Sequence, residues 1–371
     1  MSARKAYKKW AALYSGLIAL PFLFNLLVDP YGYFQVLSIP HVNREKSEVL
    51  SEYATKYYYV NRAKPDVIML GTSRMLTHDP EDVAKYTGGK AYNLALSGSN
   101  MYEQYEYLKY MTENYPVRYV VMGLDFFSFN PENKNKTGFE EDRFKGFYYR
   151  DYVHGLIGIE TLKASLLTVK NNAQNACFSI DYDEGYSTWC SRGKAFREAG
   201  ETVLLREMKS SLKTFSTDKA AYNSEKFKEP GSISGNLSYF KKIVELCRSR
   251  GITLKVFISP VYEAQFDLIY AMGLGETYEH WKSEVAKLIS FYDFTGRNSI
   301  TTDKELWWDT SHLKKEGGRL IFALLFDDKK TDVPGDFGVY VSSENAQEHI
   351  NFLHKQIEQK DLAEILELDG Y

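Results

Sequence analysis

A serine follows directly on a run of apolar residues typical of a buried strand. The strand pattern covers Val67–Gly71, and Ser73 comes two residues after it. Far downstream, Asp309 and His312 are spaced as Asp-x-x-His. A serine hydroxyl is a poor nucleophile at neutral pH, so it needs an imidazole base, and that imidazole needs a carboxylate to hold its tautomer. The pattern predicts Ser73 as nucleophile, His312 as base and Asp309 as the orienting carboxylate.

Two alternatives compete with this assignment. Asp151 and His154 form a second Asp-x-x-His, but it lies in an irregular region and is followed by Gly155-Leu156-Ile157-Gly158. The later pair stands between the last predicted strand and the last predicted helix of the domain, so we prefer it. Ser73 could also be an ordinary turn serine that bonds local backbone groups.

Five short apolar runs predict the strands of one sheet. Helical patterns separate most of them, which is typical of a parallel sheet covered on both faces. The strands are expected at Val67–Gly71, Ala91–Leu96, Tyr119–Leu124, Thr253–Ile258 and Phe291–Phe294.

The predicted helices have recognisable ends. Asp79 is a good N-cap, Pro80 suits the first helical position, and Gly88-Gly89 ends that helix. Residues 130–234 are irregular and are expected to form one long, partly helical insertion, and residues 331–371 form a separate extension. Further helices are expected at Tyr102–Asn114, Leu237–Arg250, Tyr278–Ser290 and Lys314–Phe326, with a strand at 337–341 and a helix from Ser343 to about Leu366 in the extension.

The N-terminus predicts a membrane anchor. Four basic residues between Arg4 and Lys9 precede residues 11–28, which carry no charge and would span roughly 27 Å as a helix. The positive-inside rule places residues 1–10 in the cytoplasm and the rest outside. Pro21 and Asn25 weaken the span. A cleaved signal peptide would need a small-x-small site, which does not follow, and a buried core helix would not carry the basic cluster.

Composition limits the other classes of function. The chain has 371 residues, with 46 basic and 49 acidic side chains and a net charge of -3. Since no basic stripe stands out, nucleic acid is not expected as a partner. The seven histidines are scattered, so no metal site is expected. Cys177 and Cys190 could form a disulfide in an oxidising compartment, and Cys247 fits a small buried hydrophobe.

Several of these motifs together resemble a known family. Gly71-Thr72-Ser73 follows the first strand, Asn93-Leu94-Ala95-Leu96-Ser97-Gly98 covers the end of the second, and Gly123-Leu124-Asp125 ends the third. With the anchor and the late Asp-x-x-His, they are similar to the SGNH/GDSL hydrolase superfamily. The nearest branch is that of membrane-anchored proteins serving polysaccharide O-acetylation and teichoic acid D-alanylation. The resemblance spans roughly residues 28–326.

The resemblance implies a fold and an oxyanion hole. The fold would be a three-layer α/β/α, flavodoxin-like domain over residues 29–330, and the backbone N–H groups of Ser73 and Gly98 would line the hole. Members of the family carry an asparagine donor where this chain has Asp125, and an ionised carboxylate cannot donate. Either Asp125 pairs with Arg74, or Asn100 completes the hole. Arg74 could instead contact an anionic glycan.

The resemblance also implies a function. It predicts an extracytoplasmic O-acyl transferase or esterase, using an acetyl group carried on Ser73 and acting on a polysaccharide. A multi-spanning membrane acyltransferase would supply the acyl group, and no cofactor is implied. The alternative is a non-catalytic accessory protein that binds glycan or the membrane acyltransferase through the same crevice.

Overall fold

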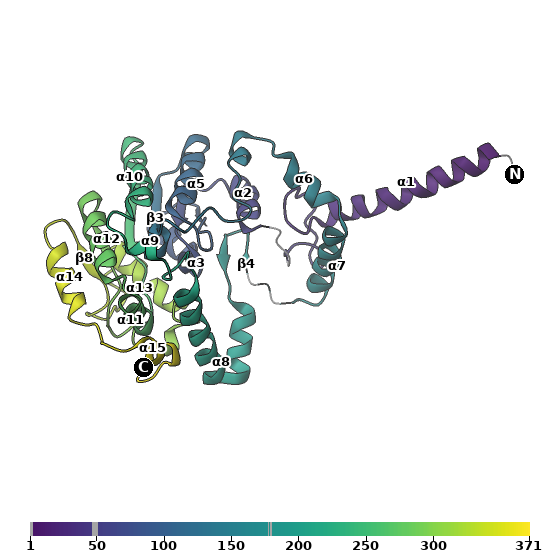
Figure 1. Ribbon diagram of the computed structural model, residues 1–371. Coiled ribbons are helices and arrows are strands. Elements are labelled where there is room, and N and C mark those ends of the chain that lie inside the picture. Colours follow the sequence, from purple (N-terminus) through teal and green to yellow (C-terminus); the bar gives the residue numbers. More distant parts are fainter. Residues whose placement is uncertain (1–2, 47–50, 177, 179) are drawn as a thin grey trace. The chain divides into compact units, whose positions relative to one another are not determined.

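The chain divides into two compact units, which we describe one at a time (Figure 1). The computed structural model describes residues 3–46, 51–176, 178 and 180–371. The anchor unit contains Met1–Arg62 and Gly138–Tyr182, and the sheet unit contains Ala63–Thr137 and Asp183–Tyr371. The irregular segment expected at about 130–234 therefore contributes to both units.

The sheet unit is an α/β structure around one six-stranded sheet. Its strand order is β2-β1-β3-β6-β7-β8, and each neighbouring pair is parallel except β7 and β8. The mainly parallel sheet predicted from the sequence is confirmed. The strands are β1 (Val67–Leu70), β2 (Ala91–Asn93), β3 (Tyr119–Leu124), β6 (Thr253–Ile258), β7 (Phe291–Asp293) and β8 (Val339–Val341), with the short β5 (Tyr186–Ser187) outside this sheet.

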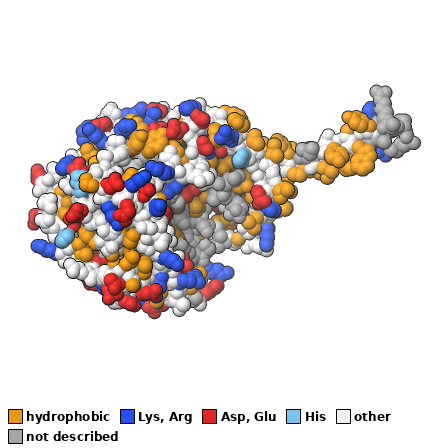
Figure 2. Space-filling model, in the orientation of Figure 1, with side chains coloured by type: hydrophobic (Ala, Val, Ile, Leu, Met, Phe, Trp, Pro, Cys, Tyr) orange, Lys and Arg blue, Asp and Glu red, His pale blue; other side chains and the backbone are white. Residues whose placement is uncertain are grey.

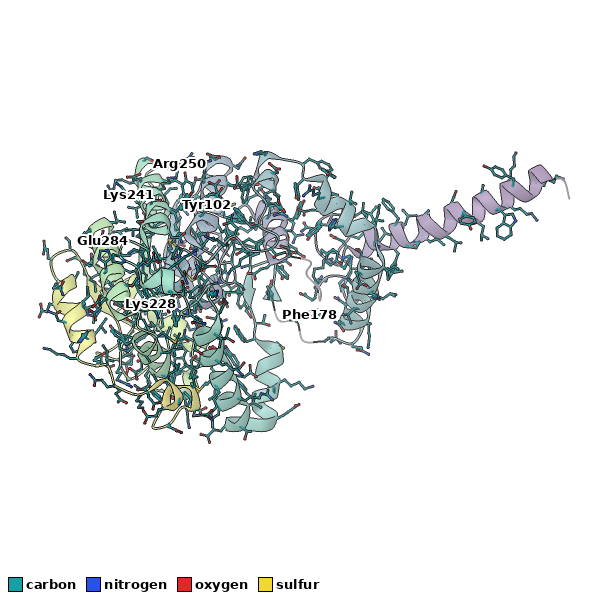
Figure 3. All side chains as sticks on the ribbon, in the orientation of Figure 1. Tyr102, Phe178, Lys228, Lys241, Arg250 and Glu284 are labelled. Carbon is teal, nitrogen blue, oxygen red and sulfur yellow. The ribbon has the colours of Figure 1, made fainter. Side chains whose placement is uncertain are left out.

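Helices connect these strands and pack in two groups. α5, α10 and α12 pack side by side, and α4 packs against α13. At the end of α10, Arg250 donates to the carbonyl of Thr112 in α5 (Figure 3). The helices of this unit are α3 (Ser73–Leu76), α4 (Glu81–Thr87), α5 (Met101–Asn114), α8 (Cys190–Thr217), α9 (Glu225–Lys228), α10 (Ser234–Ser249), α11 (Glu263–Ala271), α12 (Gly275–Leu288), α13 (Lys315–Leu325), α14 (Ala346–His354) and α15 (Leu362–Glu367), with 3-10 turns η1 (Phe126–Phe129) and η3 (Lys304–Leu306).

The structure confirms the sequence features predicted for the ends of α4 and for Cys247 in α10. The Asp79 carboxylate accepts the Glu81 N–H at 2.9 Å, and the helix ends at Gly88, whose φ of 62° suits a residue without a Cβ. Cys247 is buried in α10, where burial raises the pKa of its thiol to about 12. The expected disulfide between Cys177 and Cys190 lies outside the described residues, because Cys177 is not among them.

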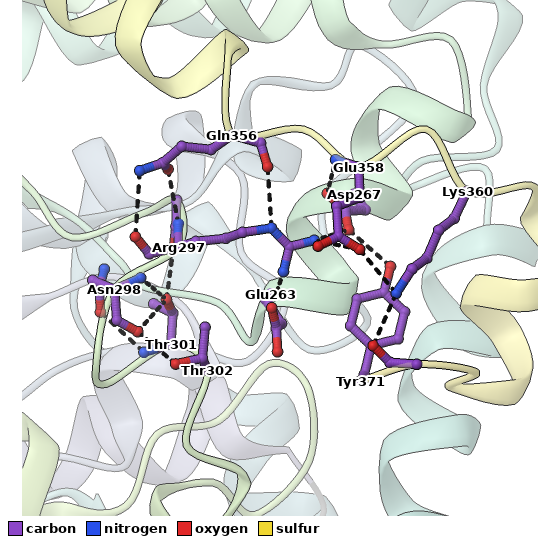
Figure 4. Close-up of polar contacts among 12 residues, drawn as sticks. Glu263, Asp267, Arg297, Asn298, Thr301, Thr302, Gln356, Glu358, Lys360 and Tyr371 are labelled. Carbon is purple, nitrogen blue, oxygen red and sulfur yellow. Dashed lines mark hydrogen bonds and ion pairs between the residues drawn. The ribbon is translucent and has the colours of Figure 1, made fainter.

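The C-terminal extension differs from its prediction. One helix was expected from Ser343 to about Leu366, but the chain forms α14 and α15 with a break between them. In the break, the Gln356 side chain accepts the Arg297 N–H at 2.9 Å and its carbonyl accepts Arg297 Nε at 3.0 Å (Figure 4). A continuous helix would use that carbonyl for its own hydrogen bond, so the contact with Arg297 replaces a helical turn.

A buried ionic cluster fixes the extension to the sheet. The Asp293 carboxylate at the end of β7 pairs with Lys282 from α12 and lies 2.9 Å from His349 Nε2 in α14. Lys282 and Asp293 are 2% and 0% exposed. Burial alone would raise the pKa of Asp293, but Lys282 and His349 outweigh burial and hold that pKa well below its usual value.

The anchor unit contains α1 (Ala3–Val28), α2 (Glu52–Ala63), α6 (Tyr149–Leu156) and α7 (Ile159–Ala173), with the 3-10 turn η2 (Glu141–Lys145) and the short β4 (Ile180–Asp181). Within the described residues, α1 is the one helix long and apolar enough to cross a membrane, over Tyr7–Val28. Figure 2 shows hydrophobic side chains along much of α1, between its N-terminal end and the rest of the anchor unit.

Asn25, which weakens α1 as a span, has an explanation in the fold. Its amide donates to the Leu156 carbonyl at 2.9 Å and its oxygen accepts the Ser165 hydroxyl at 2.8 Å. Asn25 is buried, so these bonds offset the cost of placing an amide in an apolar helix. Asn43 in turn donates to the carbonyls of Leu27 and Val28, which the helix end leaves without helical partners.

The buried cluster around Asp293 gives a stability prediction. We expect Asp293→Asn to lower the free energy of unfolding by about 3–5 kcal/mol, because Lys282 would remain buried without its carboxylate. The folded pKa of Asp293 lies below its unfolded value, so the pair contributes fully above about pH 4 and the contribution is lost as the pH falls further. Urea unfolding at several pH values measures both effects.

Glu225→Gln is the matched control, because Glu225 pairs with Lys228 on the surface and is 85% exposed. It should leave the unfolding midpoint nearly unchanged. An equal loss in both variants would show that burial of the ion pair is irrelevant to stability.

Candidate active site

Ser73 is presented by a tight turn at the carboxyl end of β1. Gly71 has a φ of +153°, and a Cβ there would lie 2.7 Å from Met75 Cβ and 3.0 Å from the Gly123 carbonyl. Thr72 is the N-cap of α3, with its hydroxyl accepting the Arg74 N–H. The crowding at Gly71 brings β1 and α3 close together, and Ser73 becomes the first residue of the helix with its side chain half-buried.

Asp309 and His312 lie in a short loop that is pinned at both ends. Trp307 and Leu313 form an antiparallel bridge, and the Trp308 N–H donates to the His312 carbonyl at 2.8 Å. Trp307 is fully buried and its indole N–H donates to the Ile300 carbonyl at 3.0 Å. The loop leads into α13 and has few conformations left to it.

The three side chains predicted from the sequence meet in this structure. His312 Nε2 lies 2.9 Å from Ser73 Oγ, and His312 Nδ1 lies 2.8 Å from Asp309 Oδ2. Asp309 also accepts the backbone N–H groups of Ser311 and His312 at 2.8 and 3.0 Å, which fixes its carboxylate. With the Nδ1 proton directed at Asp309, Nε2 is free to accept the serine proton. This geometry is that of a serine nucleophile with its base.

The second Asp-x-x-His has a different arrangement in the anchor unit. Asp151 accepts two hydrogen bonds from the buried Arg143, at 2.7 and 3.0 Å, and one from the Tyr58 hydroxyl at 3.1 Å. His154 is exposed at the end of α6. Its neighbouring carboxylate is thus occupied by a structural ion pair, which favours Asp309 and His312 as the reactive pair.

The backbone N–H groups of Ser73 and Gly98 are the oxyanion donors that the family resemblance implies. The Ser73 N–H is the first of α3, and a helix leaves its first N–H groups without helical acceptors. Gly98 is half-buried with a φ of +67°, and its carbonyl accepts Asn133 Nδ2 at 3.1 Å, which fixes the loop. A Cβ on Gly98 would lie 3.0 Å from Lys136 Cε, so this lysine lies against the same loop. The sequence analysis did not single out Lys136.

Asn100 has other partners than an oxyanion. Its oxygen accepts the Glu103 N–H at 3.0 Å as the N-cap of α5, and its Nδ2 donates to the Asn133 carbonyl and to Asn135 Oδ1. Asn100 is 3% exposed. Both amide hydrogens are therefore committed to holding the loop that carries Gly98, which makes Asn100 a support for that loop.

Asp125 and Arg74 form the pair that the sequence analysis considered. Arg74 Nη1 lies 2.9 Å from Asp125 Oδ1, and the two side chains are 5% and 0% exposed. The Thr72 hydroxyl donates to the second carboxylate oxygen at 2.5 Å. Asp125 is thus neutralised by Arg74 and turned toward the serine turn.

Arg74 also reaches the histidine loop. Its Nε donates to the Ser311 hydroxyl at 2.9 Å, and with the Gln265 amide oriented to satisfy both of its groups, the Gln265 oxygen accepts Nη2 at 2.7 Å. The guanidinium carbon lies 5.3 and 5.5 Å from the ring centres of Phe127 and Phe215. Arg74 is 5% exposed and bonds to three side chains of the protein, which favours a structural role over contact with an anionic glycan.

Aromatic side chains border the histidine. The Trp189 ring lies 5.0 Å from the His312 ring and stacks on Trp308 at 5.8 Å with an angle of 11°. The Phe196 ring also stacks on Trp308, with ring centres 5.3 Å apart, and the Lys314 ammonium lies 5.2 Å from the Trp308 ring centre. Trp189 and Phe196 come from the irregular segment of the sequence, where no periodic pattern signalled them. We call Trp189, Phe196 and Trp308 the aromatic wall.

Comparisons with known proteins add no identification. No protein-family model matches the chain, and no curated protein matches it in sequence. Within the described part of the chain, no three His, Cys, Asp or Glu side chains gather as a group that could hold a metal ion. The site is therefore interpreted from its own geometry.

The serine relay gives the first prediction from the site. A fluorophosphonate probe that labels activated serines should modify Ser73, and Ser73→Ala should abolish the labelling. His312→Ala should slow it by several orders of magnitude, because the base is lost. Mass spectrometry of the labelled peptide measures the extent.

The control is His154→Ala, which changes the exposed histidine of the other Asp-x-x-His. Its labelling rate should match that of the unaltered protein. If His154→Ala were the slow variant and His312→Ala were normal, the assignment of the base would be wrong.

The second prediction from the site concerns the ion pair of Arg74 and Asp125. Asp125→Asn and Arg74→Met should each lower stability by about 3–5 kcal/mol and slow the labelling of Ser73, since each leaves one buried charge alone. The double variant should be no worse than either single one. Thermal unfolding and probe kinetics measure the two effects together.

The assignment of Asp125 to the ion pair would be wrong if this residue lay in the oxyanion hole. In that case Asp125→Asn would restore a donor and raise the reaction rate by about a hundredfold, with no loss of stability.

Proposed function

We propose that this protein is a serine acyltransferase or esterase of the SGNH/GDSL type that acts on an extracytoplasmic polysaccharide. The observation that carries the proposal is the relay from Ser73 through His312 to Asp309, with distances of 2.9 and 2.8 Å. Such a relay raises the nucleophilicity of a serine and has no evident structural purpose beside a half-buried hydroxyl.

The topology of the sheet supports the same family. Numbered along the chain, the parallel strands β1, β2, β3, β6 and β7 lie in the order 2-1-3-4-5. That is the flavodoxin-like order, in which ligands bind outside the carboxyl ends of the strands at the switch between β1 and β3. Ser73 follows β1 and Asp125 follows β3, so the relay stands at this switch point. The two groups of helices would form the outer layers of a three-layer α/β/α domain.

The reaction would proceed in two transfers. Ser73 Oγ attacks the acyl carbonyl while His312 takes its proton, and the N–H groups of Ser73 and Gly98 bind the oxyanion. The donor leaves with the proton from His312, and the acyl group, proposed to be acetyl, remains on Ser73 as an ester. A sugar hydroxyl or water then gives its proton to His312 and attacks the ester, which releases the product and restores Ser73. Asp309 stabilises the imidazolium in both steps.

The aromatic wall supports a carbohydrate acceptor. Trp189 lies directly against His312, the side chain that would deprotonate the acceptor, and Trp308 is the residue before Asp309. Aromatic rings present flat apolar faces at little entropic cost, and such faces suit the C–H side of a sugar ring. The wall would hold the sugar with one hydroxyl near His312.

Membrane attachment completes the proposal. By the positive-inside rule, the basic residues in the first part of α1 favour a cytoplasmic N-terminus, with the chain after Val28 outside the cytoplasm. By its resemblance to the membrane-anchored branch of the family, the protein would receive its acyl group from a multi-spanning membrane acyltransferase. No cofactor is needed for the transfer.

An acyl-enzyme is the expected intermediate, and it can be tested directly. Incubating the full chain in detergent with an activated acetyl ester should add one acetyl mass to Ser73, as read by intact-mass and peptide analysis. Ser73→Ala should show no adduct, and His312→Ala a strongly reduced one. Addition of an oligosaccharide should speed loss of the adduct and produce an acetylated sugar.

Trp308→Ala tests the acceptor side of the same reaction. The adduct should still form, while transfer to the oligosaccharide falls relative to hydrolysis. If the unaltered chain forms no adduct with any activated acetyl ester, the relay is not used for acyl transfer, and a non-catalytic accessory role becomes the better interpretation.

A further inference from the structure

An apolar groove lies between the apolar half of α1 and the turn that joins α6 to α7. Its volume is about 640 Å³, and all of it belongs to the anchor unit. Asn25 lies at one end, with its amide already bonded to Leu156 and Ser165. No charged side chain is among the lining residues, which include Ser15, Ala19 and Phe22 from α1 and Ile157, Ile159 and Leu162 from the turn and α7.

The α6–α7 turn exposes large apolar side chains next to this groove. Ile157 is 64% exposed and Ile159 is 73% exposed. Figure 2 shows hydrophobic side chains continuing from α1 onto the adjoining surface of the same unit. A soluble surface seldom gathers apolar side chains of this size, and such patches mark contact with a partner or a membrane.

The contacts of the α6–α7 turn with α1 determine how deep the turn would lie in a bilayer that α1 spans. Ile159 and Leu162 line the groove together with Ala19 and Phe22. These α1 residues lie about 9–14 Å along the helix from Val28, at roughly 1.5 Å per residue. If α1 spans a bilayer and leaves it near Val28, the turn lies inside the membrane boundary and not above it. This range overlaps the depth of roughly 5–10 Å at which the apolar face of an interfacial helix enters the boundary between headgroups and acyl chains.

The charged residues nearby agree with this depth. Glu160 and Lys163 pair with each other at 2.8 Å and are 82% and 66% exposed. Neither residue lines the groove, and Lys163 can reach the headgroup layer because a lysine side chain extends toward water along its apolar stem. The turn is thus apolar toward α1 and the acyl chains and charged toward the headgroups.

We propose that the α6–α7 turn is a second membrane contact, and that the groove beside α1 holds an acyl chain of an outer-leaflet phospholipid. The proposal rests on the membrane attachment in the proposed function. Acyl chains surround every lipid-facing position of a spanning helix, so a groove with one wall on α1 is open to them. The walls supply apolar contacts without hydrogen-bonding groups, which matches a hydrocarbon chain.

Depth-dependent fluorescence quenching tests this arrangement on the full chain in phosphatidylcholine vesicles. A polarity-sensitive nitrobenzoxadiazole dye is attached at Ile159→Cys, and the unaltered chain, with its buried Cys247, gives the labelling background. The dye should emit at shorter wavelength than in water. Phosphatidylcholine with a spin label on its acyl chain should quench it several-fold more than iodide in the buffer. Lys170→Cys, near the other end of α7, is the matched control and should show the reverse.

Two results would overturn the proposal. Quenching of the Ile159 dye by iodide, as at Lys170, would place the turn in water. Shielding from both lipid and iodide would mean that a second copy of the chain or a helix of another protein fills the groove.

A dye at Leu17→Cys separates this failure from failure of the anchor. Leu17 is 61% exposed on α1 and lies within the proposed span. If lipid quenches the dye at Leu17 but not at Ile159, the anchor stands and only the second membrane contact is wrong. If lipid quenches neither dye, α1 does not span the bilayer and the membrane part of the proposed function is wrong as well.

Discussion

The buried guanidinium of Arg74 is the contact on which the geometry of the site depends. It bonds to Asp125 after β3 and to Ser311 beside His312, and it belongs to the same short helix as Ser73. Three segments far apart in the sequence are thus held by one planar group with several fixed donors. Removing a cation from water is costly, so this pair must be complete to be tolerated. That requirement makes the relative positions of the serine turn and the histidine loop nearly invariant.

The same contact determines what Asp125 does at the end of β3. A free carboxylate there would oppose an oxyanion, but Asp125 is turned to Arg74 and Thr72. Its negative charge is therefore balanced within the site. Asn100 and Asn133 hold the loop that carries Gly98, whose backbone N–H is one of the two oxyanion donors in the proposed function. At the end of β3, Asp125 therefore orients Arg74 and Thr72.

Farther from the site, other buried charged or polar side chains also join segments that are distant in sequence. Lys282, Asp293 and His349 join α14 to the end of β7, and Arg297 holds the break between α14 and α15 (Figure 4). In the anchor unit, Asn25 fastens the α6–α7 turn to α1. In each case a polar group in an apolar setting is satisfied by a segment distant in sequence, so it specifies which surfaces meet.

The sequence by itself determined the sheet strands, the helices with clear caps and the apolar N-terminal helix, because those depend on local periodicity and on cap residues. It also identified Ser73, Asp309 and His312, since the chemistry limits which residue types can act together. Their position in the chain favoured Asp309 and His312 over the second Asp-x-x-His, and the tertiary structure added that Arg143 occupies Asp151. Only the tertiary structure revealed Trp189 and Phe196 beside His312, and the break in the C-terminal helix. Those features depend on contacts between residues far apart in the chain, and a local pattern carries no signal of its distant partner.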